Sequence, residues 1–344
     1  MPSPRLAFSP VDKILSTPLC GVLGVEVPIV QAPIGSASIP ELAAAVANAG
    51  ALGMLGLTWV DADTAVARVS STRRLTDRPF GVNFGLAFPI RAQLTAALQA
   101  GARVVSTFWG DPGLVHRDIA DAGALHLHTV GTAAEARRAV DAGVEVIVAQ
   151  GWESGGHVWG QVATMALVPA VVDAVSPVPV IAAGGIADGR GLVAALALGA
   201  QAVWMGTRFV TATEADTHAT YRRLVVEASA EDTVHTVCFD GGWPNATQRV
   251  LRNRTWENWD QAGRPSAPNR PGEGTPVARD SGGRQFHLYD DMMPLANLTG
   301  DVEQMANYAG QSVGLVHETA PAADIVRRII DQARSVLDFE QSRG

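Results

Sequence analysis

The fold class is decided by residues 177–209, which read PVPVIAAGGIADGRGLVAALALGAQAVWMGTRF. This stretch holds an apolar run of strand length (178–182), a glycine-rich loop, a helical segment rich in alanine and leucine (189–198) and a second apolar run (202–206). Near-continuous apolar runs are typical of parallel strands that are covered on both faces. The Leu-Gly pair at 198–199 supplies the left-handed glycine that often ends a helix. The stretch therefore predicts two parallel strands joined by a helix.

The same unit repeats toward the N-terminus. We expect strands near 28–31, 51–57, 81–86, 102–108, 124–129, 145–149, 178–182 and 202–206. Helices are expected at 39–49, 61–76, 91–100, 113–122, 133–142, 166–174 and 189–198. Eight strands that each lead into a helix are typical of a parallel (β/α)8 barrel, an α/β fold. An open doubly wound sheet is the alternative; it is less favoured because no Gly-x-Gly-x-x-Gly follows the first strand.

Composition changes near residue 230, and this change sets the expected domain organisation. We expect a barrel over 1–230 and a smaller, irregular or helical region over 231–320 that covers the barrel mouth. The latter includes GRPSAPNRPGEGTP (263–276), which reads as a loop or a flexible excursion. Apolar residues at helical spacing predict a closing helix over 321–344, packed on the barrel.

The charge and the rare residue types exclude several classes of protein. The net charge of −8 argues against binding to nucleic acid or to an anionic membrane. Lys13 is the only lysine, so no Walker A loop exists and a Schiff-base mechanism is disfavoured. The two cysteines build neither a disulfide framework nor a cysteine zinc site. No export signal or membrane span is evident, so we expect a soluble, cytoplasmic protein.

Candidate site residues follow the predicted strands, where this kind of barrel carries its chemistry. The loops after the last two strands contain Gly184-Gly185 and Met205-Gly206-Thr207. Each of these loops opens a helix, and exposed backbone N–H groups there predict a phosphate site. Further candidates are Ala32 and Pro33 after the first strand and Asn83 at the end of the third.

The sharpest signal is the loop QGWESGGH (150–157), which combines Gln150, Gly155, Gly156 and His157. His157 could act as a base near neutral pH. Glu153 could be a carboxylate base or a salt-bridge partner, and the sequence does not choose between them. Trp152 and Trp159 could form a pocket wall.

His126 and His128 share one face of a predicted strand. If that face points inward, they could bind a metal or line the site. Because no third ligand stands at a suitable spacing, a structural role is favoured and no metal site is expected.

At these residues the sequence resembles the nitronate monooxygenase family, formerly called 2-nitropropane dioxygenases, which are FMN enzymes on a TIM barrel. The matching blocks include residues 28–53, RPFGVNF (78–84), AGVEVIVAQGWESGGH (142–157), 177–209 and YAGQSVGLV (308–316). Flavin-dependent enoyl-thioester reductases of the FabK type look much the same over these blocks.

The resemblance implies roles for particular residues. His157 matches the family's catalytic histidine, Ala32 and Pro33 pass beside the flavin, and Gly155 lies against it. It also implies that Asn83 and Gln150 hydrogen-bond the FMN, and that Gly184 or Gly185, with Met205, Gly206 and Thr207, holds its phosphate. The family commonly has Ala where this chain has Ser154, and one residue, not two, between the histidine and the next glycine.

Three hypotheses follow for the activity. The first is oxidation of alkyl nitronates with O2 to carbonyl compounds and nitrite. The second is NAD(P)H-dependent reduction of an enoyl or acyl thioester, or of a quinone. Five arginines (249, 252, 254, 264 and 270) could then hold a carrier such as CoA, although a solvated loop is the simpler interpretation. The third is a non-enzymatic flavin-binding scaffold. The expected partners are a small-molecule substrate and O2, and a homo-oligomer is possible.

Overall fold

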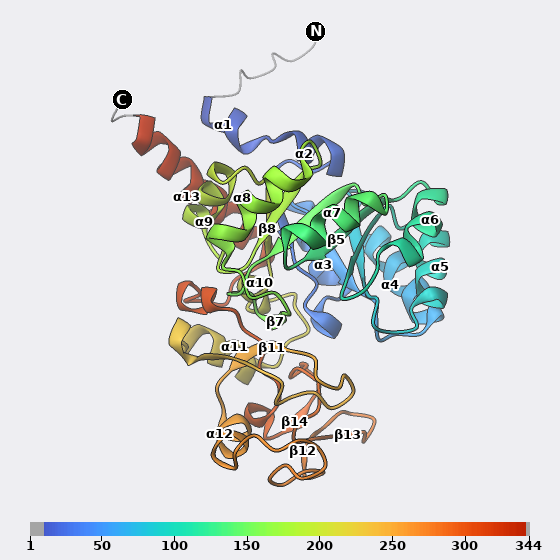
Figure 1. The fold of residues 1–344 in the computed structure, drawn as a ribbon, viewed down its shortest axis with the longest axis vertical. Helices are drawn as coiled ribbons and strands as arrows, with labels where there is room; N and C mark the ends of the chain where they lie inside the picture. Colours follow the sequence, from blue (N-terminus) through green and yellow to red (C-terminus); the bar gives the residue numbers. More distant parts are fainter. Residues whose placement is uncertain (1–9, 342–344) are drawn as a thin grey trace.

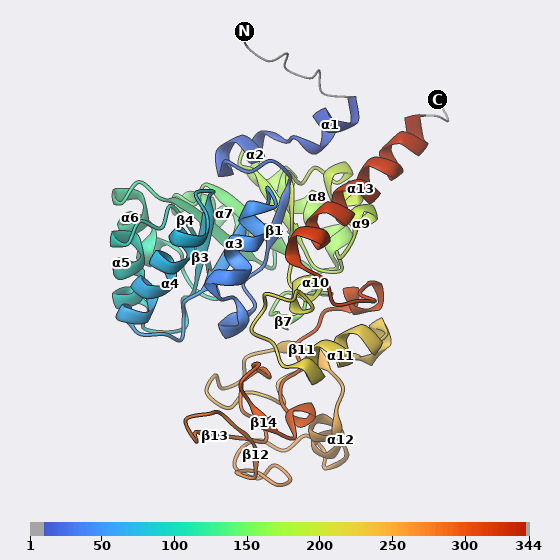
Figure 2. The same ribbon diagram turned by 180° about the vertical axis from the view of Figure 1, so that it is seen from behind.

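The computed structural model describes residues 10–341, and its main body is a barrel of eight parallel strands surrounded by helices (Figures 1 and 2). The order around the sheet is β1-β9-β8-β6-β5-β4-β3-β2. A parallel bridge between Val30 and Leu52 joins the two outermost strands, β1 and β2, and closes the ring. The predicted (β/α)8 architecture is confirmed.

All eight barrel strands lie within two residues of their expected bounds. They are β1 (Ile29–Gln31), β2 (Gly53–Gly56), β3 (Phe80–Gly85), β4 (Val104–Phe108), β5 (Leu125–Val130), β6 (Val146–Gln150), β8 (Val180–Ala183) and β9 (Ala202–Met205). The helices between them are α3 (Pro40–Asn48), α4 (Ala62–Leu75), α5 (Arg91–Gln99), α6 (Gly113–Asp121), α7 (Ala133–Asp141), α8 (Thr164–Val175), α9 (Gly189–Ala197) and the short α10 (Thr207–Val210).

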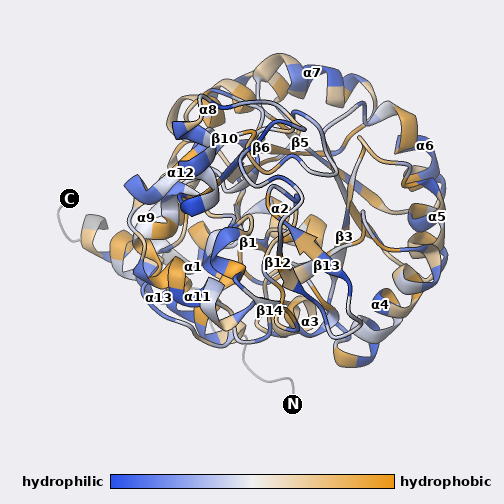
Figure 3. Cartoon of the chain, turned by 90° about the horizontal axis from the view of Figure 1, so that it is seen from below, coloured by the Kyte–Doolittle hydropathy of each residue, from blue (hydrophilic) through white to orange (hydrophobic). Residues whose placement is uncertain are grey.

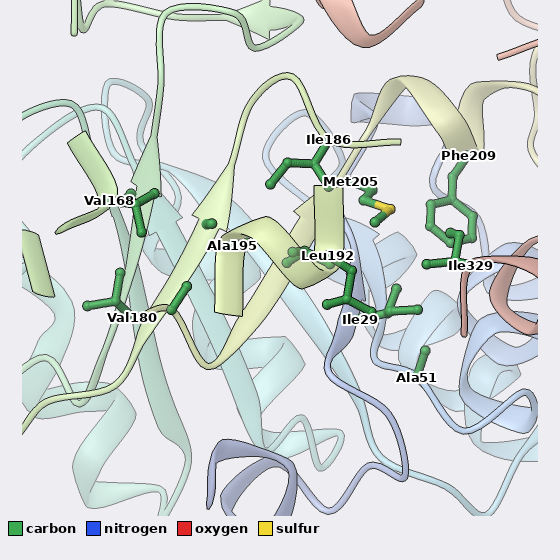
Figure 4. Packing of buried hydrophobic residues seen from close by; sticks show 14 of the residues in the cluster. Ile29, Ala51, Val168, Val180, Ile186, Leu192, Ala195, Met205, Phe209 and Ile329 are labelled. Atoms are coloured by element: carbon green, nitrogen blue, oxygen red, sulfur yellow. The ribbon is translucent and has the colours of Figure 1, made fainter. Parts of the chain in front are cut away.

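Side-chain alternation divides each strand between two cores. Inward residues such as Met54, Leu127 and Ile181 fill the barrel, and Leu19 of α2 (Pro18–Leu23) closes its N-terminal end. Outward residues pack against the helices. Figure 4 shows this second layer, where Ile29 lies near Leu192 of α9. The strands therefore have apolar neighbours on both faces, as their sequence indicates.

The region after the barrel contains more strand than the sequence predicted. Helix α11 (Ala219–Glu227) leads into β10 (Thr233–Thr236) and β11 (Gln248–Leu251), which are followed by α12 (Arg254–Gln261). A second small antiparallel sheet consists of β12 (Pro276–Arg279), β13 (Gln285–His287) and β14 (Thr299–Gly300). We call residues 231–320 the cap. It lies across one end of the barrel, in front of the ring of helices in Figure 3.

The chain returns to the barrel in α13 (Ala322–Gln341), which packs against α9 and α3. Most of the range 321–344 is thus helical, and residues 342–344 lie outside the described part of the chain. Within residues 10–341, no helix combines the length and the apolar character needed to cross a membrane.

Candidate active site

A cavity of about 1020 Å³, including its open mouth, lies at the C-terminal ends of the barrel strands. We call it the inner cavity. The lining includes Ala32, Pro33, Asn83, Gln150, Gly155, Gly156, His157, Gly184, Gly185, Gly206 and Thr207. Loops that are far apart in the sequence thus meet at one place.

Met205 is the one residue of the predicted flavin-binding set that does not line this cavity. Its side chain is fully buried between the barrel and the helices, as Figure 4 shows. Alternation explains this placement, because the inward position next to it is held by Trp204, which does line the cavity. The carbonyl oxygen of Met205 accepts a hydrogen bond from Ala32 N at 2.8 Å, so the Met205 backbone helps to hold the loop after β1.

The glycines of the last two barrel loops lie where the backbone conformation or a neighbouring group excludes a side chain, or where the space beside the backbone is open. Gly184 and Gly185 have φ angles of 108° and 71°, a region that disfavours other residues. A Cβ on Gly184 would lie 2.7 Å from Ser154 Oγ. At Gly206 a Cβ would meet only Ala32 Cβ, at 3.6 Å, so this position is open. The two loops form a cradle of bare backbone.

Three buried polar atoms in the inner cavity have no hydrogen-bond partner within the described chain: Gln150 Oε1, Ser154 Oγ and His157 Nε2. Gln150 is held from its other end, since its Nε2 donates to the carbonyl of His157 at 3.1 Å. An unpaired buried polar atom costs roughly 1–3 kcal/mol. Three such atoms make the cavity suited to a polar molecule that could satisfy them.

His157 is held by the cap and not by the barrel alone. It lies on β7 (Gly156–His157), which pairs with β11 so that Gln248 faces His157 and Arg249 faces Gly156. The Arg249 guanidinium donates to the carbonyl of Trp152 at 2.9 Å, which fixes the same loop a second time. A strand of the cap therefore positions the imidazole.

The His157 ring lies among aromatic and acidic neighbours. Trp243 stacks on it with ring centroids 4.3 Å apart and an interplanar angle of 30°. Tyr308 lies at 5.7 Å and Trp109 meets the ring edge-on at 5.9 Å. Nε2 lies 3.5 Å from Asp291 Oδ2, and both side chains are about 90% buried. The imidazole is thus largely shielded from water.

A second cavity, which we call the outer cavity, continues from the first toward the cap. The two share Gly35, His157, Met293 and Tyr308. Trp59 and Phe88 line the outer cavity from the barrel side, and Phe286, Asp290 and Asp291 line it from the cap. His157 therefore stands at the junction of two spaces, one within the barrel mouth and one beneath the cap.

Trp159 joins the aromatic cluster around His157, whereas Trp152 does not. The Trp159 ring packs on Trp109 at 4.9 Å and its Nε1 donates to Glu135. Trp152 instead packs on His235 at 4.1 Å, and neither cavity includes it in its lining. Trp159 does not line either cavity, so neither tryptophan forms the predicted pocket wall directly.

His126 and His128 point away from the barrel interior. Both are buried, and Thr107 Oγ1 lies 2.8 Å from a ring nitrogen of each. Burial is the main cause that lowers the pKa of His126 to about 3 and that of His128 to about 4. No metal-binding group of three or more ligands occurs among residues 10–341. The inward alternative is wrong, and the favoured structural role agrees with these contacts.

Glu153 also has a structural role, a choice that the sequence left open. Its carboxylate accepts hydrogen bonds from Thr164 N at 2.9 Å and from Thr164 Oγ1 at 2.8 Å. Thr164 is the first residue of α8, so Glu153 satisfies a backbone donor at the start of that helix.

The five arginines proposed for a CoA-like carrier all have partners within the chain. Arg249 bonds to Trp152, Arg252 to the carbonyl of Glu231, Arg254 to Asp301 and Arg264 to Asp260. Arg270 is largely buried between Asp240 and Glu273. The interpretation of these residues as structural or surface charges is favoured.

Three residues that shape the site were missed from the sequence: Trp243, Asp291 and Met293. All three come from cap segments without regular periodicity, and only the fold brings them to His157. Tyr308 begins the block YAGQSVGLV, but nothing in the sequence assigned it a place near the histidine. The Asp-Asp pair at 290–291 was the one available signal for Asp291.

The relatives of this chain identify its class, which is that of FMN-type oxidoreductases. The family model for nitronate monooxygenase matches residues 16–93 and 85–332, and the chain belongs to this family.

Relatives and solved structures agree with this assignment. Nitronate monooxygenase of Pseudomonas aeruginosa is 32% identical over 364 residues, covering 91% of this chain and 98% of the relative. A Mycobacterium tuberculosis protein named (3aS,4S,5R,7aS)-5-hydroxy-7a-methyl-1-oxo-octahydro-1H-indene-4-carboxyl-CoA dehydrogenase is 37% identical, covering 73% and 70%.

Among solved structures, FabK from Thermotoga maritima has a TM-score of 0.79 at 33% identity, covering 95% of this chain and 99% of that one. Nitroalkane oxidase from Streptomyces ansochromogenes has a TM-score of 0.74 at 30% identity, covering 91% and 98%.

Proposed function

We propose that the protein is an FMN-dependent enzyme that oxidises alkyl nitronates with O2 to carbonyl compounds and nitrite. One observation carries the proposal: His157 Nε2 and Gln150 Oε1, which make no hydrogen bond within the described residues, lie in the same cavity as the glycine cradle. Full-length relatives named nitronate monooxygenase support the choice of reaction.

The inner cavity fits the FMN that the family implies. Asn83 and Gln150 would hydrogen-bond the flavin ring, which would pass beside Ala32, Pro33 and Gly155. A terminal phosphate would be held by Gly184, Gly185, Gly206 and Thr207, where no Cβ blocks the backbone of the glycines. When bound, the flavin supplies the electron acceptor and the reactivity toward oxygen.

His157 and its neighbours supply position and charge. His157 donates a hydrogen bond to the oxygen atoms of an anionic nitronate, or it takes the α-proton of a neutral nitroalkane. Trp243 and Trp109 cover two sides of the imidazole and exclude water from it. The outer cavity provides an entry route that reaches His157 from the cap.

The test uses purified protein saturated with FMN. Aerobic incubation with ethylnitronate or propionate-3-nitronate, without reduced nicotinamide, should consume oxygen and release nitrite. His157→Asn should lower kcat/KM by about 100-fold or more and keep the flavin absorption spectrum. A preparation that binds no FMN, or that holds FMN but releases no nitrite from either substrate, contradicts the proposal.

Reduction of an acyl thioester with NAD(P)H is the second candidate, and the mycobacterial relative named as a CoA dehydrogenase favours it. The engaged arginines do not add support. Anaerobic addition of NADH or NADPH separates the two functions, because rapid loss of flavin absorbance is expected only of the reductase.

A further inference from the structure

We infer that Asp291 is a positioning residue for His157: its carboxylate, anchored by Tyr308, holds the imidazole in the charged form that meets an anionic substrate. The inference rests on the proposed function for the catalytic part of His157. Its structural part, the pairing of Asp291 with His157, stands on the contacts below.

The carboxylate of Asp291 is divided between two partners. Oδ1 accepts a hydrogen bond from the Tyr308 hydroxyl, and Oδ2 lies 3.5 Å from His157 Nε2. No other hydrogen bond to Oδ2 occurs within residues 10–341. At 3.5 Å the two atoms are close enough for an ion pair when the imidazole carries its second proton, and a small shift of either side chain would bring them into hydrogen-bond contact.

The backbone around Asp291 is fixed, so the carboxylate is not on a free loop. Asp291 N donates to the carbonyl of Gly241 at 2.9 Å, and Gly241 N donates to the carbonyl of Tyr289 at 2.9 Å. These bonds tie the segment of Asp291 to the segment that carries Trp243, which stacks on His157. The cap therefore presents the aromatic ring and the carboxylate to the imidazole as one unit.

Tyr308 remains a hydrogen-bond donor over the whole physiological range. Burial, reinforced by the neighbouring Asp291 charge, raises the pKa of Tyr308 well above its usual value. One oxygen of the carboxylate is therefore always satisfied by a neutral donor. The other carboxylate oxygen, Oδ2, faces His157 Nε2.

The other charged groups near the imidazole have partners elsewhere. On β11, which pairs with β7, the Arg249 guanidinium is directed to Trp152. Asp290 bonds to the backbone N of His287 at 2.7 Å, and Arg270 bonds to Asp240 and Glu273. Arg284 lies over the Phe286 ring. Among the described residues, Asp291 is the acidic group within ion-pair distance of His157.

A nearby opposite charge favours the charged form of a titratable group, and more strongly where water is excluded. The resulting imidazolium–carboxylate pair is neutral as a whole, so it does not repel an approaching anion. The imidazolium can then donate a hydrogen bond to a nitronate. An unpaired Asp291 at the same place would oppose that binding.

The test compares Asp291→Asn with Asp290→Asn, a matched control one residue away that also lines the outer cavity. Protein labelled with ¹⁵N-histidine and saturated with FMN is studied by NMR, and His157→Asn assigns the resonances among the eight histidines. At about pH 6.5, where a free imidazole is half charged, D291N should lower the charged fraction of His157 at least about threefold. D290N should leave it at the wild-type value.

Tyr308→Phe provides a second variant whose effect has the opposite sign. Loss of the hydroxyl frees the carboxylate from its neutral donor, so the charged fraction of His157 should rise. This variant keeps the ring and the backbone contact, since the Tyr221 hydroxyl donates to the Tyr308 carbonyl. A rise in Y308F supports the pairing even where D291N fails to fold.

Activity gives an independent readout. With ethylnitronate, kcat/KM should fall as pH rises, and in D291N this fall should begin at lower pH, with a loss of about tenfold or more near neutrality. Equal charged fractions in wild type, D291N and Y308F overturn the inference. An altered fraction in a protein that releases no nitrite keeps the pairing and contradicts the proposed function alone.

Discussion

Gly155 and Gly206 both line the inner cavity, but Gly155 packs against backbone whereas Gly206 faces open space. Alanine substitutions at the two positions should therefore have different effects. A Cβ on Gly155 would lie 2.3 Å from Gly310 N and 2.6 Å from Ala309 C, which are backbone atoms that cannot turn aside. Gly155→Ala should therefore lower the free energy of unfolding by about 1–3 kcal/mol. The Cβ added by Gly206→Ala would contact only Ala32 Cβ, so this variant should have the same thermal midpoint as the wild type.

Flavin titration gives the complementary result for this pair. In Gly206→Ala the new methyl group points into the cradle, so the affinity for FMN should fall about tenfold or more. Fluorescence titration measures this change, and differential scanning calorimetry measures the stability of both variants. Wild-type FMN affinity in G206A would exclude this loop from the phosphate site.

His126 and His128 predict a pH dependence of stability. Their pKa values lie at about 3 and about 4, below the ordinary imidazole value, so the unfolded chain binds more protons than the folded chain. The stability they contribute is complete above about pH 6.5 and is lost as pH falls below that value, down to about pH 4 for His128 and about pH 3 for His126. Each group contributes up to about 1.4 kcal/mol per pH unit in that interval.

Urea unfolding at several values between about pH 7 and pH 4.5 tests this dependence. His126→Asn should reduce the slope of the unfolding free energy against pH by about one proton. His317→Asn is the control, since that side chain is exposed and should leave the slope unchanged. A His126→Asn slope equal to that of wild type would contradict the assignment.

At the scale of elements, Glu153 links the loop 150–157 to helix α8. Glu153→Gln weakens the acceptor of Thr164 N and Oγ1 and should lower the free energy of unfolding by about 1 kcal/mol. Nitronate turnover should persist. A loss of about 100-fold in kcat/KM at unchanged stability would instead identify Glu153 as a base; chemical denaturation and nitrite release provide the two measurements.

The barrel elements could be predicted because each one carries a local signal. Strands such as β6 and β8 are continuous apolar runs, and α4 begins at Asp61, whose side chain accepts from Thr64 N. The cap strands lack such signals: β7 and β14 have two residues each and pair with partners distant in sequence. Their formation depends on the packing of the whole molecule, so only the barrel could be anticipated.

The candidate site shows the same difference between residues of the barrel and residues of the cap. Residues that follow barrel strands, such as Asn83, Gln150 and Gly184, could be placed together from the strand order alone, and they do line one cavity. Asp291 and Trp243 could not, because their position depends on how the cap folds. The direction of His126 was also open, since alternation gives a shared face but not which face points inward.

At the scale of the whole molecule, α13 holds the C-terminal segment on the barrel through one close approach. A Cβ on Gly189 would lie 2.3 Å from Ala333 N and 2.5 Å from Ile329 O. Gly189→Ala should therefore separate α9 from α13 and lower the thermal midpoint by several degrees. Gly191→Ala, two residues on, meets a side chain at 3.0 Å and should cost much less. Thermal scans of both variants provide the comparison; equal midpoints would show that the contact is not tight.

The pairing of β7 with β11 has a consequence for engineering and for divergence within the family. Because a two-residue strand carrying His157 is hydrogen-bonded to residues more than ninety positions later, barrel and cap do not behave as exchangeable modules. A chimera with a cap from another protein would also replace β11, the strand to which the His157 segment is hydrogen-bonded. New substrate ranges should therefore arise by changes within the cap's loops while its hydrogen-bonded edge to the histidine is retained.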